Sequence, residues 1–224
     1  TISGNTVSSN DGDGIYADVI NNSTFTVSNN TIGVDEDEEF SGNSGNGIYL
    51  CAEGECNDST LRLFGNSISG NSSIGLYLYD IFGSTVTIGK NAAGEVDGNT
   101  ITDNGSTGIY IQYIGFFEPD PSSVDISNNT VSGNQDHGIY IGSVDEVSSV
   151  EIDENTISGN TSTGIYLDWS ARGVTITSNT INNNGEIDTG IHVNQANGNE
   201  ARNNKISGNN VGVNNQDEGG NDFD

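Results

Sequence analysis

Apolar residues in this chain come in short stretches in which apolar and polar positions alternate. One series contains Ile48-Tyr49-Leu50 and Ile109-Tyr110-Ile111, and another contains Val124-Asp125-Ile126 and Val150-Glu151-Ile152. A period of two is typical of β-strands. Apolar residues never keep a helical spacing over three turns, so the pattern predicts short strands and almost no helix.

The stretches recur within a longer repeat whose units each start at an Asn-x-Ile or Asn-x-Val step. The starting residues are Asn5, Asn30, Asn66, Asn99, Asn129, Asn155, Asn179 and Asn204. A near-constant frame with variable insertions indicates a solenoid. Three strands per unit, each stacked on its equivalent in the next unit, predict an all-β parallel β-helix of about eight turns. We expect residues 1–224 to form one domain, which is a segment or mature part of a longer chain.

Asparagine is expected inside this solenoid. The starting Asn has the same parity as the core residue two positions later, so its side chain should point inward and bond to neighbouring turns. A second series lies three residues after that core residue: Asn10, Asn43, Asn71, Asn104, Asn134, Asn160, Asn184 and Asn209. Two asparagine ladders should therefore flank the first strand of every turn.

The frame Asn-Thr-Ile-Ser-Gly-Asn followed by Gly-Ile-Tyr-Leu resembles the right-handed parallel β-helix repeat of the pectate-lyase-like superfamily. Similar repeats occur in carbohydrate-binding proteins, sugar hydrolases and large surface proteins. The resemblance covers almost the whole chain and implies a right-handed solenoid. It also implies two classes of function, because relatives of this fold include both surface proteins and polysaccharide lyases, hydrolases and epimerases.

The net charge of the chain restricts the classes of molecule that it can bind. Five basic residues stand against 32 acidic ones, which gives a net charge of −27 and argues against nucleic acid, an anionic membrane and polyanionic substrates. The mean hydropathy of −0.44 and the lack of a long apolar run predict no membrane insertion. No cofactor is expected, with Ca²⁺ as an open alternative. Asp11 and Asp13, in an Asp-Gly-Asp step, could begin a Ca²⁺ loop, or they could simply fill a turn.

Cys51 and Cys56 are the only cysteines. A metal site would need further ligands nearby, so a disulfide that closes a small loop is the simpler interpretation. Such a bond is typical of an oxidising compartment and favours an extracellular or cell-surface location.

Catalytic residues are not identified by the sequence. The basic residues are scattered over different units, and the nearest candidate is the step Asp136-His137-Gly138, in which a carboxylate adjoins a histidine. His192 replaces the tyrosine of its series and is a second, equally isolated histidine.

Tyrosines form a file between inward-facing residues, so they should project outward from one sheet as a surface aromatic ladder. Its members are Tyr16, Tyr49, Tyr77, Tyr110, Tyr140 and Tyr166. The file could only reinforce the sheet, through aromatic pairs worth about 0.5–1.5 kcal/mol each. Alternatively it could be a strip that binds sugar rings or a second rod, or a floor that a loop covers.

N-glycosylation sequons are frequent in a chain so rich in Asn, Ser and Thr. We predict glycans at Asn22, Asn29, Asn57 and Asn128, in loops and corners, rather than at Asn71, Asn104 and Asn160, which belong to the second ladder.

The sequence thus predicts an extracellular structural or adhesive rod, which could be a subunit of a surface fibre. Its expected partners are carbohydrate or further copies stacked end to end on unpaired strand edges. A carbohydrate-active enzyme is the alternative.

Overall fold

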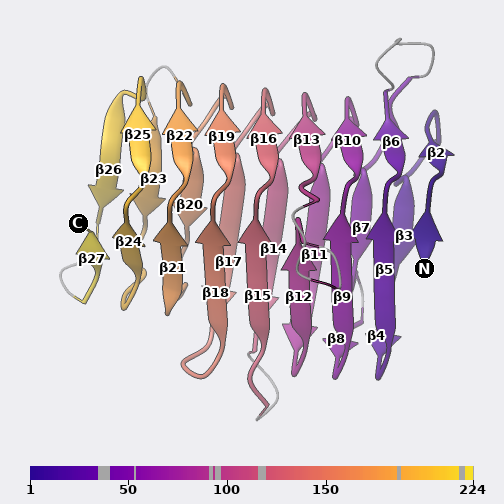
Figure 1. Ribbon diagram of the computed structural model, residues 1–224, viewed down its shortest axis with the longest axis horizontal. Coiled ribbons are helices and arrows are strands. Elements are labelled where there is room, and N and C mark those ends of the chain that lie inside the picture. Colours follow the sequence, from indigo (N-terminus) through magenta and orange to yellow (C-terminus); the bar gives the residue numbers. More distant parts are fainter. Residues whose placement is uncertain are drawn as a thin grey trace.

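The computed structural model describes residues 1–34, 41–52, 54–90, 93, 97–115, 120–185, 188–216 and 220–223. They form a straight solenoid with the N-terminus and the C-terminus at opposite ends of its long axis (Figure 1). All regular elements of these residues are strands, and the strands of each sheet pair in parallel, so both the strand prediction and the three-strand turn are confirmed.

Each turn contributes one strand to each of three sheets. Sheet B holds the strand that follows the starting Asn: β2 (Thr6–Val7), β6 (Thr31–Gly33), β10 (Ser67–Ser69), β13 (Thr100–Thr102), β16 (Thr130–Ser132), β19 (Thr156–Ser158), β22 (Thr180–Asn182) and β25 (Lys205–Ser207).

Sheet C carries the tyrosine file: β3 (Ile15–Ala17), β7 (Ile48–Leu50), β11 (Leu76–Phe82), β14 (Ile109–Ile114), β17 (Ile139–Val144), β20 (Ile165–Leu167), β23 (Thr189–Val193) and β26 (Val211–Asn215), with the short β4 (Ile20–Asn21) and β8 (Cys56–Asn57) beside it. Sheet A completes the turn: β1 (Ile2–Ser3), β5 (Thr24–Ser28), β9 (Thr60–Phe64), β12 (Thr85–Ile88), β15 (Ser123–Ser127), β18 (Ser149–Asp153), β21 (Val174–Thr177), β24 (Glu200–Arg202) and β27 (Asp222–Phe223).

The core consists of apolar residues stacked in register from turn to turn. Ile109, Ile139, Ile165 and Ile191 pair in sequence along sheet C and are all fully buried. Burial of each such side chain contributes about 1.5–3 kcal/mol relative to an exposed one. The alternation predicted from the sequence therefore assigns the inward and outward faces correctly.

Both predicted asparagine ladders are present and buried. The carboxamide oxygen of Asn129 accepts from the backbone N and the Nδ2 of Asn99, at 3.0 and 2.9 Å. Its own Nδ2 donates to Asn155 Oδ1 at 3.0 Å and to the carbonyl of Ile88 at 2.9 Å. In the second ladder, Asn104 Nδ2 donates to Asn134 Oδ1 at 3.0 Å. Each buried amide thus bonds across the turns, as a polar group inside a protein must.

A third polar ladder, which the sequence did not reveal, lines the corner before sheet A. The hydroxyl of Ser84 accepts from the backbone N of Ser59 at 2.9 Å, and Ser148 Oγ accepts in the same way from Ser122. Towards the C-terminus asparagine takes over, because Asn199 Oδ1 accepts from the backbone N of Val174. All three corners of the solenoid are therefore held by side chains bonded to the backbone of the adjacent turn.

The corner before the starting Asn requires a left-handed backbone. Its φ is 54° at Asn29, 62° at Asn128 and 54° at Glu154, in the region that asparagine and glycine tolerate best. Gly98 does not adopt a left-handed φ, but a Cβ there would lie 1.9 Å from the carbonyl oxygen of Asn128. Glycine is needed at that position for close approach.

Replacing Asn129 with Ala should lower the stability of the rod more than a surface substitution on the adjoining strand β16. It leaves the Asn99 amide and the carbonyl of Ile88 without their partner, at about 1–3 kcal/mol for each buried group. Thermal unfolding followed by circular dichroism measures the loss. Thr130→Ala, at an exposed position of β16, is the matched control. Equal melting temperatures for the two variants would contradict the role of the ladder.

Candidate functional site

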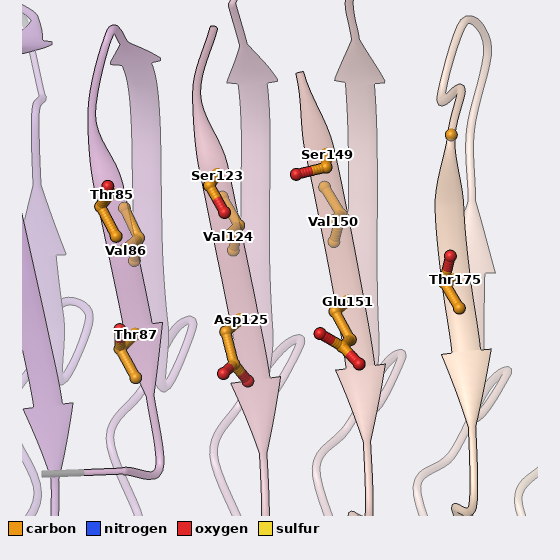
Figure 2. Close-up of a pocket in the computed structure, with 11 residues that line it drawn as sticks. Thr85, Val86, Thr87, Ser123, Val124, Asp125, Ser149, Val150, Glu151 and Thr175 are labelled. Atoms are coloured by element: carbon orange, nitrogen blue, oxygen red, sulfur yellow. The ribbon is translucent and has the colours of Figure 1, made fainter. Parts of the chain in front are cut away.

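A shallow groove crosses the outer face of sheet A over β12, β15, β18 and β21 (Figure 2). Its volume is about 440 Å³. Two rows of outward side chains line it: Thr85, Ser123 and Ser149 in the first, and Thr87, Asp125, Glu151 and Thr175 in the second. Because the strands pair in register, each row repeats at the strand separation of about 4.8 Å. The groove is therefore a regular lattice of hydroxyl and carboxylate groups.

Two carboxylates lie side by side in this groove. Asp125 and Glu151 occupy paired positions of β15 and β18. Lys90 Nζ lies 3.2 Å from Asp125 Oδ2, while Asp125 Oδ1 is buried without a hydrogen-bond partner among the described residues. Glu151 is exposed. The two residues hold the same place in the Val-x-Ile stretches, and this was the signal in the sequence that could have revealed their pairing.

The tyrosine ladder forms as predicted on the outer face of sheet C. Ring centroids of Tyr49 and Tyr77 are 4.5 Å apart and those of Tyr110 and Tyr140 are 4.3 Å apart, both stacked face to face. Tyr77 and Tyr110 meet edge to face at 5.0 Å. Burial raises the pKa of Tyr77 above its usual range. Ring faces that cover one another stabilise the sheet and leave little aromatic surface for a sugar.

The most exposed aromatic side chains lie at one end of the tyrosine ladder and outside it. Tyr16, at one end of the ladder, is 51% exposed, and Trp169 is 70% exposed. Trp169 lies in the corner between β20 and β21, where its carbonyl accepts from Ser143 Oγ at 3.0 Å. Sequence reasoning did not single out Trp169. Because it is the only tryptophan of the chain, it is a natural fluorescent reporter close in sequence to the groove-lining Gly173 and Thr175.

The two histidines flank one tyrosine at the C-terminal part of the ladder. Ring centroids of His137 and His192 lie 4.7 and 4.9 Å from that of Tyr166. His137 Nε2 is 3.6 Å from Asp136 Oδ1, whereas its buried Nδ1 has no hydrogen-bond partner among the described residues. Burial lowers the pKa of His137, against the opposing effect of Asp136 and Asp188.

Asp168 adjoins this histidine pair. The Tyr140 hydroxyl donates to its Oδ2, and Asn194 Nδ2 donates to its Oδ1 at 3.0 Å. With both oxygens bonded inside the ladder, Asp168 supports Tyr140 and Asn194. The structure thus places Asp136, Asp168, Asp188 and His192 close enough to His137 to affect its charge. Sequence spacing alone did not indicate this grouping.

Asp80 is a further carboxyl group in an unusual setting. Burial, helped by the negative charge of Glu55, raises its pKa to about 6. Its Oδ1 has no hydrogen-bond partner in the part of the chain that the structure describes. The group follows Tyr79 on β11, where two consecutive side chains are partly exposed and the strict alternation of the strand is lost.

Cys51 and Cys56 form a disulfide with Cα atoms 5.3 Å apart, as predicted. Of the two candidate Ca²⁺ ligands, Asp13 is bonded to the next turn: its Oδ1 accepts from the backbone N and the Nδ2 of Asn46, at 2.6 and 2.9 Å. Asp11 is exposed. Among the described residues no three His, Cys, Asp or Glu side chains converge to hold a metal ion. Nor do those residues contain a helix long and apolar enough to cross a membrane.

The predicted glycosylation sites differ from the ladder asparagines in exposure. Asn22 and Asn29 are exposed, and Asn57 is partly exposed. Asn128 is also partly exposed, but its Nδ2 atom, to which a glycan would attach, is buried, so the structure does not favour a glycan at this predicted site. Asn71, Asn104 and Asn160 are buried, and the Nδ2 atom of each donates to the next asparagine of the second ladder.

Residues 80–224 match a family profile described as "Right handed beta helix region", and residues 1–92 match one described as "Periplasmic copper-binding protein (NosD)". Among solved structures the chain is similar to the Dettilon tailspike protein, with 14% identity and a TM-score of 0.52 over 88% of this chain and 47% of the tailspike. It therefore spans about half the length of that protein.

A second solved structure similar to the chain is the A-module of the mannuronan C-5 epimerase of Azotobacter vinelandii, with 14% identity and a TM-score of 0.39 over 88% of this chain and 74% of the module. No curated protein sequence matches the chain.

Copper does not fit the residues that match the second profile. Copper is bound in proteins by imidazole, thiolate and thioether groups. Residues 1–92 contain neither histidine nor methionine, and their two cysteines are joined to each other.

The stability of the rod should decrease on mild acidification because of His137. Since burial lowers its pKa below the 6.5 of a free histidine, the unfolded chain binds the proton more readily than the folded chain. The contribution of neutral His137 to the free energy of unfolding is at its full value above about pH 6.5 and is lost as the pH falls further.

His137→Thr, which copies the residue of the neighbouring turns at Thr107 and Thr163, tests this effect. The melting temperature of the variant should fall less than that of the wild type between pH 7.5 and pH 5. Asp136, Asp168, Asp188 and His192, the charged groups around His137, are present in both proteins, so their effects largely cancel in the comparison. An identical pH dependence would show that His137 does not contribute.

Expression in a eukaryotic secretory host should place glycans on Asn22, Asn29 and Asn57 but not on Asn71, Asn104 or Asn160. Asn128 is removed from the expected sites, because its Nδ2 atom is buried. The second group has no accessible amide, because each Nδ2 is buried and bonded. Glycopeptide mass spectrometry reads out each site. Sugar on the ladder asparagines with Asn22, Asn29 and Asn57 unmodified would contradict the assigned faces.

Proposed function

The chain belongs to the right-handed β-helix family, and we propose that it is an extracytoplasmic adhesive rod that binds a glycan in the groove of sheet A. The regular lattice of hydroxyl and carboxylate groups in that groove is the observation that carries the proposal. Membership of the β-helix family supports the rod-like architecture, and the groove supports the binding of a glycan.

The groove fits the chemistry of a sugar polymer. Each Ser or Thr hydroxyl offers one donor and two acceptor positions, and each carboxylate accepts hydrogen bonds. A pyranose unit is about as long as the strand separation of about 4.8 Å, so a chain that runs along the rod meets equivalent groups on successive strands. Thr85, Ser123 and Ser149 provide three such equivalent positions.

Charge narrows the class of glycan. The net charge of −27 produces a field that repels nucleic acids and acidic polysaccharides. The groove adds two carboxylates, of which one is bonded to Lys90. Uncharged or cationic glycans are therefore the ligands we propose.

Two observations support a location outside the cytoplasm: a disulfide and a match to a family profile. A disulfide between Cys51 and Cys56 persists in oxidising compartments. Residues 1–92 resemble a protein described as periplasmic. End-to-end association of such rods into a fibre stays a prediction.

A glycoside-cleaving enzyme is the second candidate, and the paired carboxylates favour it. Enzymes that hydrolyse glycosidic bonds use two carboxyl groups, one as acid and one as nucleophile or base. Asp125 and Glu151 are such a pair within a groove. Release of new reducing ends from bound oligosaccharides distinguishes this candidate from a binding rod, which releases none.

Filling the groove should weaken glycan binding without affecting the fold. Ser123→Tyr places a large side chain at the centre of the first row, on a strand face that accepts aromatic residues. We expect affinity for the best uncharged or cationic oligosaccharide of an array to fall at least about tenfold, or about 1.4 kcal/mol. Trp169 fluorescence and calorimetry provide two readouts.

Thr130→Tyr, at an exposed position of sheet B, is the matched control and should bind like the wild type. If no uncharged or cationic glycan binds the wild type, the adhesive function is wrong. If Ser123→Tyr binds like the control variant, the groove is not the site.

A further inference from the structure

The pairing of Asp125 with Glu151 is unfavourable for the fold. Two carboxylates on neighbouring strands, about one strand separation apart, repel each other. Lys90 offsets only part of this charge, through Asp125 Oδ2 at 3.2 Å. Local conflicts of this kind in otherwise consistent structures are concentrated at functional sites.

The same sheet shows how such a conflict is resolved within the chain. Glu200 and Asp222 are also paired in register on β24 and β27. There the guanidinium of Arg202 forms ion pairs with both carboxylates, with Nη2 2.7 Å from Asp222 Oδ2. Asp125 and Glu151 have no equivalent cation between them among the described residues. Glu151 is exposed in the groove, and Asp125 Oδ1 has no hydrogen-bond partner in the part of the chain that the structure describes.

We propose that a ligand supplies this missing cation, and that the groove binds an amino-sugar glycan whose unacetylated ammonium group lies between Glu151 and Asp125. The inference rests on the glycan-binding function proposed above and specifies its ligand. An ammonium group has three donors, two of which match the two carboxylates that are paired on β15 and β18. The sugar hydroxyls then bond to Thr85, Ser123 and Ser149.

A metal ion fits this position less well than an ammonium group. Ca²⁺ takes six to eight oxygen ligands, whereas only two carboxylates meet here and no larger group of acidic or histidine side chains converges among the described residues. A simple polyamine would satisfy the charge but would leave the row of Thr85, Ser123 and Ser149 without a role. The net charge of −27 further attracts a cationic ligand.

The test compares three tetrasaccharides by calorimetry: a glucosamine tetramer, its fully N-acetylated form and a glucose tetramer. The glucosamine tetramer should bind best, and its affinity should fall with added salt. Glu151→Gln should lower its affinity about ten- to a hundredfold, the effect of losing one charge-assisted hydrogen bond. The same substitution should leave the affinity for the uncharged tetramers unchanged.

Glu154→Gln is the matched control, because it removes one charge from an exposed corner three residues away and outside the groove. It should retain the preference for the glucosamine tetramer. Asp125→Asn is the second groove variant and should also lower the affinity for that tetramer. Melting curves confirm that all variants are folded.

Other outcomes overturn the inference in distinguishable ways. Equal binding of all three tetramers refutes the ammonium site but leaves the glycan-binding rod in place, whereas binding of none removes both. Spermine binding that depends on Glu151 and equals that of the tetramer identifies a polyamine site instead. Ca²⁺ binding lost in Glu151→Gln identifies a cation site, and an equal loss in Glu154→Gln shows a general charge effect.

Discussion

Hydrogen bonds between stacked asparagine side chains set the geometry on which the rest of the rod depends. Each inward amide accepts from the residue one turn before and donates to the residue one turn after, as Asn129 does between Asn99 and Asn155. A shift of one residue would turn the whole ladder outward and leave buried amides unpaired. The ladders therefore fix the register of every turn, although insertions change the spacing between the units.

Because the register is fixed, residues at equivalent positions of successive units stack in a row on the surface of one sheet. Positions that are equivalent in successive units lie one strand apart on the same face, which brings together residues 22 or more positions apart in the chain. The file of tyrosines on sheet C and the rows of the groove on sheet A arise in this way. The same mechanism places the carboxylates of Asp125 and Glu151 side by side, because nothing in the backbone pairing distinguishes like from opposite charges.

Strands, sheet faces, both asparagine ladders, the outward tyrosines and the disulfide follow from the sequence. Their signals are local or exactly repeated, so one parity rule is sufficient to place Ile139 inward and Tyr140 outward. The serine ladder of Ser84 and Ser148 was missed because serine is abundant throughout the chain and its few inward positions look like turn residues. The histidine pair around Tyr166 was missed because one histidine precedes its strand and the other lies within one.

The groove was harder to predict for a different reason. Its lining residues are ordinary outward positions, and no single unit contains a motif for it. What distinguishes it is a combination of residues across four strands, Thr87, Asp125, Glu151 and Thr175, of which two repel each other. Because the inward ladders carry the stability, these outward positions are free to vary with little effect on the fold. A solenoid of this kind can thus hold an unfavourable charge pair on its surface, provided that the ligand which neutralises it binds only there.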